Sequence, residues 1–254
     1  MIETKKEKKD EKKRKVRIDS LLTEKGYAES CRKAQALIMA GKVLAGGNLV
    51  DKPGKEVDPE SVITVRGSLP YVGRGGLKLA GPLDELRIRV EGLVAMDVGS
   101  STGGFTDCLL KRGAQKVYAV DVGKGLLDIS LRNDPRVCVL EGRNIRYLHT
   151  AEVGEKVDLV TIDVSFISLE KVLPKIREFL KEDGMALALV KPQFEVEKGL
   201  VGKGGIVRDP AKHREVLDRM TRFAASIGFK PVAELVSPIT GAKGNKEFWL
   251  FLKA

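Results

Sequence analysis

Residues 93–107 read LVAMDVGSSTGGFTD, and residues 117–121 read VYAVD. An apolar run of strand length ends at Asp97, and a glycine-rich turn follows it. The next segment, FTDCLLKRG, has the pattern of a helix that Gly113 terminates, and the second apolar run ends in Asp121. A strand, a glycine turn, a helix and a strand that ends in an acid together predict a nucleotide-binding βαβ unit.

The turn GSSTGG narrows the class of nucleotide. In the dinucleotide fingerprint GxGxxG the second glycine lets a pyrophosphate approach, and Ser101 at that point argues against NAD and FAD. The phosphate-loop pattern is also absent. A glycine turn with an acid about 20 residues further on, here Asp121, suits a ligand with a ribose and no phosphate, of which S-adenosylmethionine is the common one. The alternative is a tight turn that binds no ligand.

The composition favours an intracellular protein that binds nucleic acid. The 254 residues suit one large domain or two modest ones, and the formal net charge of +10 favours a polyanion, against the alternative of a merely soluble surface. Three cysteines without a CxxC pattern and two distant histidines predict a reducing compartment and no metal site. No apolar run approaches the ~20 residues that span a bilayer, and the charged N-terminus lacks a secretory signal. We therefore expect a cytoplasmic protein with no membrane association.

Composition shifts divide the chain into four segments. Residues 1–15 are lysine-rich and predict a disordered leader that either contacts RNA phosphates or is simply solvated. Residues 16–66 predict a compact module, and the glycine- and proline-containing residues 67–76 predict a linker. Residues 77–254 alternate strand and helix patterns, which predicts an α/β domain with a Rossmann-like, mostly parallel sheet covered by helices on both faces.

The module at residues 16–66 has two predicted helices, the second with Ser30 as N-cap and Gly41 as its stop, followed by short strands. It resembles the S-four-type RNA-binding domain, a small α+β fold, in Arg17-Ile-Asp19, residues 30–36, residues 40–43 and Lys52-Pro53-Gly54. One departure is Cys31, where that family usually has an arginine. The resemblance implies phosphate contacts from Arg17, Arg32, Lys33 and Lys42.

Two charged residues, Asp163 and Lys191, close apolar strands at the sheet edge where open α/β sheets bind ligands. Taken alone, they predict either a catalytic pair or a structural ion pair. With Lys78 in GRGGLKL and Glu247 in GNKEFWL, they resemble the K-D-K-E tetrad of FtsJ-type ribose 2′-O-methyltransferases. Apart from the leader, the whole chain resembles the TlyA family of rRNA 2′-O-methyltransferases, some of which are labelled haemolysins.

The resemblance implies a role for each residue of the tetrad. Because a ribose 2′-hydroxyl is a poor nucleophile at neutral pH, the site must align it with the sulfonium methyl group and help to remove its proton. Lys191 is expected to accept the proton and Asp163 to orient that lysine. Lys78 and Glu247 are expected to position the hydroxyl.

The cofactor residues expected from the turn and the resemblance form one set. The turn should enclose the methionine part, Asp121 should hold the ribose, and Asn144 should meet the adenine edge or else cap a helix. The set is Asp97, Gly99, Ser100, Ser101, Thr102, Gly103, Gly104, Phe105, Asp121, Val122, Asn144 and Asp163.

The glycine-rich segment at residues 197–208 predicts either a mobile loop that binds the substrate or a solvent-exposed loop without a function. This segment contains three further basic residues that would face phosphates, namely Lys198, Lys203 and Arg208. Arg74 of the linker completes the expected RNA-binding set. The substrate implied by the resemblance is rRNA or a ribosomal subunit, with a cytidine of the large-subunit rRNA favoured because the chain stops seven residues after Glu247. The competing interpretations are a non-catalytic ribosome-assembly factor and a secreted haemolysin, and a monomer is expected.

Overall fold

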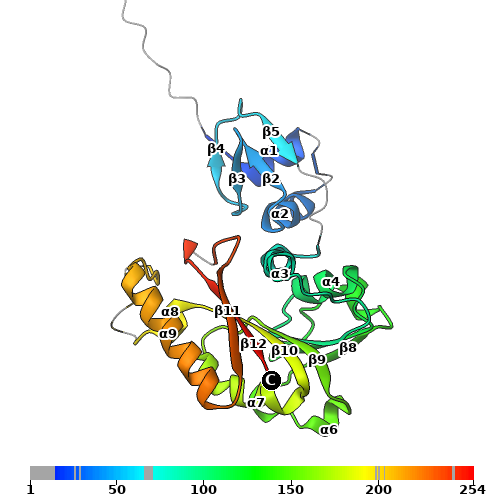
Figure 1. Cartoon of the computed structure of the whole chain (residues 1–254). Coiled ribbons are helices and arrows are strands. Elements are labelled where there is room, and N and C mark those ends of the chain that lie inside the picture. The colour runs from blue at the N-terminus through cyan, green and yellow to red at the C-terminus, as the bar shows by residue number, and fades with distance from the viewer. Residues whose placement is uncertain are drawn as a thin grey trace, which may run out of the picture. The chain divides into compact units, whose positions relative to one another are not determined.

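The computed structural model describes residues 15–25, 27–28, 30–65, 71–197, 199, 201–202, 204–241 and 244–254. These residues form two compact units that divide between Leu69 and Pro70 (Figure 1). The smaller unit contains β1 (Val16–Arg17), α1 (Ile18–Glu24), α2 (Cys31–Met39), β2 (Val43–Ala45), β3 (Asn48–Val50), β4 (Glu56–Val57) and β5 (Ile63–Val65). The larger unit contains α3 (Arg74–Glu85), β6 (Val94–Val98), α4 (Gly104–Lys111), β7 (Lys116–Asp121), α5 (Ile129–Arg132), β8 (Val137–Glu141), η1 (Ile145–Tyr147), α6 (Thr150–Val153), β9 (Val157–Ile162), η2 (Leu169–Lys171), α7 (Leu173–Phe179), β10 (Leu180–Val190), α8 (Pro192–Glu195), α9 (Pro210–Ser226), β11 (Lys230–Val236) and β12 (Phe248–Lys253).

The smaller unit packs two helices against short strands. β1 pairs with β4, and β3, β2 and β5 form a three-stranded antiparallel sheet. Ser30 caps α2 as predicted, because its side chain accepts a hydrogen bond of 3.3 Å from the Lys33 backbone N–H. Gly41 follows the helix with a positive φ of 67°, which an L side chain adopts with difficulty. The core includes the fully buried Ile18, Leu22 and Ile38.

The sheet of the larger unit has seven strands in the order β11-β12-β10-β9-β6-β7-β8. Strands β6 to β10 pair in parallel, and β12 runs antiparallel to both of its neighbours, β10 and β11. The chain passes from β6 outward through β7 and β8 and then returns to the other side of β6 as β9. The boundary between β6 and β9 is therefore the topological switch point, where open α/β sheets bind ligands.

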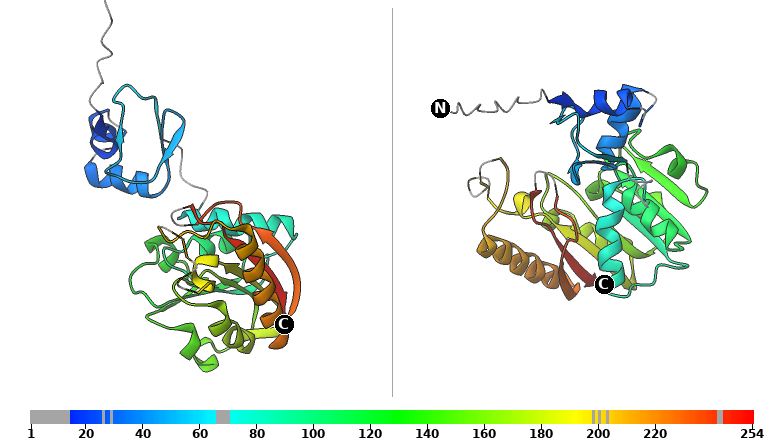
Figure 2. Two further views of the ribbon diagram at one scale, coloured as in Figure 1. Left: turned by 90° about the vertical axis from the view of Figure 1, so that its left-hand side faces the viewer. Right: turned by 90° about the horizontal axis from the view of Figure 1, so that it is seen from above.

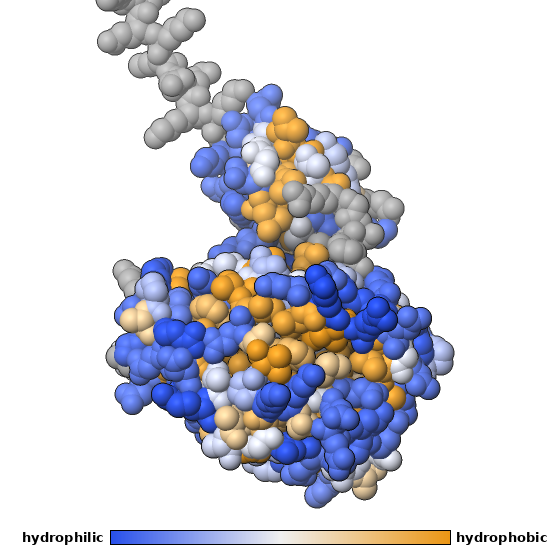
Figure 3. Space-filling model, in the orientation of Figure 1, coloured by the Kyte–Doolittle hydropathy of each residue, from blue (hydrophilic) through white to orange (hydrophobic). Residues whose placement is uncertain are grey.

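Alternate side chains along the strands enter two separate cores. Met96 and Ile162 face the core covered by α6, α7 and α9, whereas Ala95 and Leu159 face the core covered by α3, α4 and α5. The right-hand view of Figure 2 shows α9 and α3 on opposite sides of the strands. Figure 3 shows apolar residues across the middle of one face of this unit, with hydrophilic residues around them. The predicted α/β fold with helices on both faces is confirmed.

The segment at residues 74–76, predicted to belong to the linker, instead forms the first turn of α3. Glycine here permits close packing. A Cβ added to Gly104 would lie 2.9 Å from the Gly76 backbone nitrogen and 3.1 Å from Gly75 Cα, and one added to Gly76 would lie 2.3 Å from the Tyr71 ring. These three glycines allow α3 to lie directly against the start of α4. Glycines in such a cluster usually predict a loop, but here they allow two helices to pack closely.

Candidate active site

The glycine turn after β6 is shaped by close approach to the loop after β9. Gly99 has a positive φ of 87°, and a Cβ at this position would lie 2.5 Å from the carbonyl oxygen of Asp163. Only glycine meets both conditions, so the turn and Asp163 come together at the switch point. Ser101 also has a positive φ, of 49°, and its backbone N–H donates to Asp121 Oδ2 over 2.8 Å. Asp121 therefore holds the turn in this less favourable conformation.

Asp97 is a fully buried carboxyl group beneath the turn. Its Oδ2 accepts hydrogen bonds from the Thr106 backbone N–H at 2.9 Å and the Thr106 hydroxyl at 2.7 Å. Its Oδ1 is buried and has no hydrogen-bond partner among the described residues. Burial raises the pKa of Asp97 to about 7, and the carboxylates of Asp163 and Asp121 act in the same direction. A buried acceptor without a donor is a feature that a cationic ligand would satisfy.

Two adjoining cavities open beside the turn and share Gly99, Ser101 and Asp163. The larger cavity, of about 500 Å³, lies between the segment after β7 and the segment after β9, and its lining includes Asp121, Val122, Leu126, Asn144, Val164, Ser165, Phe166 and Ile167. The smaller cavity, of about 320 Å³, is lined by Arg74, Gly75, Lys78, Ser100, Thr102, Gly104, Phe105, Thr240 and Gly241 besides the shared residues. Ten of the twelve predicted cofactor residues line one or both of these cavities, and the other two, Asp97 and Gly103, line neither.

Asp121 and Asn144 have local hydrogen bonds as well as positions in the wall of the larger cavity. Asp121 Oδ1 accepts from the Gly123 backbone N–H at 2.7 Å. Asn144 Oδ1 accepts from the Arg146 backbone N–H at 3.1 Å and caps η1, which is the alternative role predicted for it. Each oxygen of the Asp121 carboxylate keeps a further lone pair for a ligand.

The tetrad residues form two ion pairs at the carboxyl edge of the sheet. Lys78 Nζ on α3 lies 2.7 Å from Glu247 Oε2, just before β12, and both side chains are largely buried. Lys191 Nζ at the end of β10 lies 2.5 Å from Asp163 Oδ1 at the end of β9 and donates to Ser165 Oγ over 2.9 Å. The four residues come together because β12 is reversed, which brings Glu247 to the edge where β9 and β10 end.

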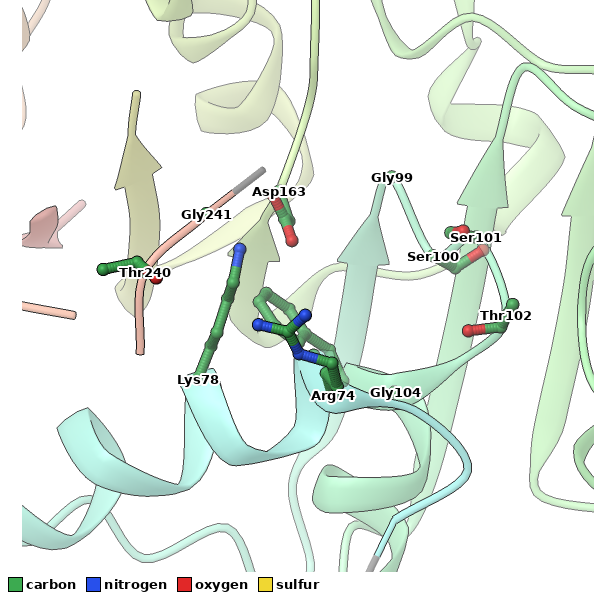
Figure 4. Close-up of a pocket in the computed structure, with 12 residues that line it drawn as sticks. Arg74, Lys78, Gly99, Ser100, Ser101, Thr102, Gly104, Asp163, Thr240 and Gly241 are labelled. Carbon is green, nitrogen blue, oxygen red and sulfur yellow. The ribbon is translucent and has the colours of Figure 1, made fainter. Parts of the chain in front are cut away.

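Figure 4 shows how these residues face the smaller cavity. The side chains of Lys78 and Arg74 rise from α3, and the Asp163 carboxylate points into the same space from the opposite wall. Gly241 is drawn on the side of Lys78 away from Arg74, and a Cβ at this position would meet Glu247 Oε1. The cavity therefore presents an ammonium and a carboxylate next to the glycine turn.

The predicted RNA-binding residues of the smaller unit have different surroundings. Arg17 makes a bidentate contact with the buried Asp19, with distances of 3.0 Å and 2.7 Å, so it has a structural role although its side chain is 57% exposed. The Arg17 contact lowers the pKa of Asp19 to about 2, against the effect of burial. Arg32 is exposed on α2, and Lys33 and Lys42 line a surface hollow of about 500 Å³.

The remaining basic residues belong to the larger unit. Arg74 is exposed at the smaller cavity, and Arg208 is exposed just before α9. The predicted residues Lys198 and Lys203 lie outside the residues that the structure describes.

Two cavity residues, Ser165 and Phe166, are absent from the set predicted from sequence. Ser165 accepts from Lys191, and Phe166 is 91% exposed with a positive φ of 64°. The Phe166 ring lies 4.9 Å, centroid to centroid, from the ring of Phe194 on α8. An aromatic residue in the polar turn directly after a strand-ending acid, as in TIDVSF, is the sequence signal that marks this position.

Over the described ranges, no helix is long and apolar enough to cross a membrane. Within the same part of the chain, no group of three or more His, Cys, Asp or Glu side chains is placed to hold a metal ion.

Comparison with known proteins identifies matches to both units. A family model described as an FtsJ-like methyltransferase matches residues 71–254, and a model of the S4 (S-four) domain matches residues 16–63. The protein YqxC of Bacillus subtilis is 49% identical over 94% of this chain and 86% of its own length. The 16S/23S rRNA (cytidine-2′-O)-methyltransferase TlyA of Mycobacterium tuberculosis is 45% identical over 94% of this chain and 90% of its own. A solved structure from Streptococcus thermophilus has 42% identity and a TM-score of 0.75, and covers 94% of this chain and 88% of its own.

Proposed function

The chain belongs to the FtsJ-like methyltransferase family, and from this premise we propose that it is an enzyme that transfers a methyl group from S-adenosylmethionine to a ribose 2′-hydroxyl of rRNA. The observation that carries the proposal is the convergence of the Lys191–Asp163 and Lys78–Glu247 pairs at a cavity that adjoins the glycine turn. The rRNA substrate is supported by the S4 domain match and by the Mycobacterium tuberculosis relative. Within rRNA, a cytidine of the large subunit is the proposed target.

The residues around the turn fit S-adenosylmethionine. In the described part of the chain no donor reaches the buried Asp97 Oδ1, and an acceptor in this state suits the ammonium group of the methionine part. Gly99 leaves the backbone open to close approach, and the free lone pairs of Asp121 suit the two ribose hydroxyls. Val122 and Asn144 form the part of the larger cavity that suits an adenine ring. When bound, S-adenosylmethionine supplies a sulfonium methyl group as the electrophile.

The four tetrad residues can then activate and align the acceptor. Lys191 in its neutral form accepts the proton of the 2′-hydroxyl, and its contacts with Asp163 Oδ1 and Ser165 Oγ fix the position of Nζ. Lys78 Nζ donates to the same ribose oxygen and orients a lone pair toward the methyl group. Glu247, held between Lys78 and Gly241, prevents Lys78 from turning away.

The rim of the cavities suits a single nucleotide of RNA. Phe166 presents an exposed aromatic face at the rim of the larger cavity, and proteins bind unstacked bases on such faces. Arg74 at the smaller cavity is placed to contact a phosphate. An rRNA substrate also places the reaction in the cytoplasm, where ribosomes are made, and we expect the enzyme to act as a monomer.

Transfer of labelled methyl groups from S-adenosylmethionine to rRNA, with 2′-O-methyl sites mapped in cells with and without the protein, tests this function. We expect one or a few ribose positions to lose methylation in the absence of the protein. Lys191→Ala should remove the activity, and Lys181→Ala, at the opposite end of β10 from Lys191, should retain it. An unchanged methylation map together with no transfer in vitro would favour a non-catalytic assembly factor.

A further inference from the structure

The loops that follow β9 and β10 face each other through three side-chain contacts in sequence order. Lys191 contacts Asp163 and Ser165, Phe194 contacts Phe166, and Glu195 contacts Ser168 and the Leu169 backbone. The first contact belongs to the proposed chemistry, and the second lies at the cavity rim. The third contact, made by Glu195, has no part in the mechanism described above.

Glu195 is a buried carboxylate with only 6% of its surface exposed. Its Oε1 accepts from the Leu169 backbone N–H at 2.9 Å, and its Oε2 accepts from the Ser168 hydroxyl at 2.7 Å. Arg219 on α9 donates to the Glu195 backbone oxygen at 2.5 Å and lies 3.5 Å from Oε2. Both carboxylate oxygens act as acceptors, because the Leu169 N–H can only donate and the Ser168 hydroxyl gives its one hydrogen to Oε2 while it accepts from the Glu170 N–H at 3.1 Å. In a glutamine the NH₂ group replaces one of these acceptors, so either the Leu169 N–H or the Ser168 hydrogen loses its partner.

The loop between Asp163 and Ser168 needs such an anchor. It begins on the sheet, where the Asp163 backbone N–H donates to the Val98 oxygen at 2.9 Å, and it ends at the two acceptors of Glu195. Between these points, Phe166 adopts a positive φ of 64° while its side chain is almost fully exposed. A bulky residue keeps this conformation only where the surrounding structure imposes it.

We propose that Glu195 is a positioning residue for methyl transfer, because it fixes the loop that places Ser165 against Lys191 and Phe166 at the rim of the larger cavity. The expected effect of Glu195 on the rate of methyl transfer rests on the proposed function. Glu195 touches neither reactant, and it acts through the loop. Burial also raises the pKa of Glu195, while its two hydrogen bonds and Arg219 oppose that effect, so the anchor depends on keeping these partners in place.

A double-mutant cycle between Glu195→Gln and Ser165→Ala tests the proposal. We expect each single substitution to lower kcat for methyl transfer by roughly tenfold or more, since small misplacements of reacting groups cost up to ~10²-fold in rate. If Glu195 acts through the loop that carries Ser165, the double variant should lie within about threefold of Glu195→Gln. An additive loss, near the product of the two single effects, would overturn the proposal.

The control variant is Glu170→Gln, which changes a glutamate that also contacts Arg219, at 3.2 Å, but whose side chain does not hold the loop. Its kcat should match the wild type. If Glu195→Gln does not fold, Ser168→Ala removes one of the two donors and takes its place in the cycle. If Ser168→Ala leaves kcat unchanged, and its combination with Ser165→Ala has the kcat of Ser165→Ala alone, the proposal is wrong.

Amide hydrogen exchange separates this inference from the proposed function. Exchange at residues 164–169 should be faster in Glu195→Gln than in wild type or Glu170→Gln, whether or not the protein methylates rRNA. If wild-type protein transfers no methyl group, the proposed function fails while the exchange data still decide the role of Glu195. Unchanged protection of these amides in a folded Glu195→Gln protein would refute it.

Discussion

Binding of S-adenosylmethionine should depend on pH through Asp97. With a pKa of about 7, this carboxyl group is about 10% ionised at pH 6 and about half ionised at pH 7. The ammonium of the ligand favours the ionised form, and an α-amino group of pKa about 7.7–8.0 stays mostly protonated over this range. The affinity should therefore rise about fivefold from pH 6 to pH 7, with uptake of the ligand accompanied by release of about half a proton at pH 7.

The raised pKa of Asp97 also makes the stability of the ligand-free protein depend on pH. The folded-state pKa of Asp97 lies above its ordinary value of 3.8, so folding favours the neutral form of this group. Its contribution to stability is most favourable below pH 3.8 and decreases as the pH rises toward 7. Ligand binding near neutrality should oppose that decrease.

Isothermal titration calorimetry in buffers of different ionisation enthalpy measures both the affinity and the proton release. Asp97→Asn should remove the pH dependence, and Asp158→Asn, at the opposite edge of the sheet where it accepts from Val94 N–H at 2.9 Å, should retain it. An affinity that stays constant between pH 6 and pH 7 without proton release would refute the reasoning. So would the same pH slope in Asp97→Asn.

Four further substitutions have distinct expected outcomes. Lys191→Arg should abolish methyl transfer while cofactor and RNA still bind, because a guanidinium cannot accept the proton; substantial turnover would leave Lys191 with only a positioning role. Asp121→Ala should weaken S-adenosylmethionine binding by roughly 1–3 kcal/mol, measured by calorimetry, and unchanged affinity would remove it from the site. Arg32→Ala should weaken RNA binding and reduce the salt slope by about one, and an unchanged slope would exclude a phosphate contact. Gly99→Ala should lose cofactor binding and lower the thermal midpoint, because its Cβ would lie 2.5 Å from the Asp163 oxygen at a positive φ; a near wild-type midpoint would contradict this packing argument.

The sequence was sufficient for the features that depend on local pattern. The strand that ends near Asp97, the glycine turn and the acid at Asp121 follow from periodicity and spacing over fewer than thirty residues. The two interpretations of Asp163 and Lys191, as an ion pair or as catalytic residues, both describe the same contact of 2.5 Å. The ion pair is present, and its position at the switch point is what supports a catalytic role.

Features that depend on contact between distant segments could not be predicted in this way. Ser165, Phe166 and Glu195 acquire their roles from how two loops after neighbouring strands face each other, and neither loop has a periodic pattern. Glycines at positions 75 and 76 predict a linker by the usual punctuation rules, yet they serve close helix packing. A single sequence cannot separate these two uses of glycine, because both require only the absence of a side chain.

The reversal of β12 has a consequence for the order in which the enzyme acquires its parts. The cofactor side of the sheet, from β6 to β8, is built from segments that follow one another closely, whereas Lys78 and Glu247 are 169 positions apart. β12 also enters between β10 and β11, so β11 has no sheet partner until β12 arrives. Loop closure should therefore form the proposed cofactor site early in folding and the proposed proton-transfer site late. Pulse-labelled hydrogen exchange during refolding should find the β6 and β7 amides protected before those of β11 and β12, and the reverse order would contradict this sequence of events.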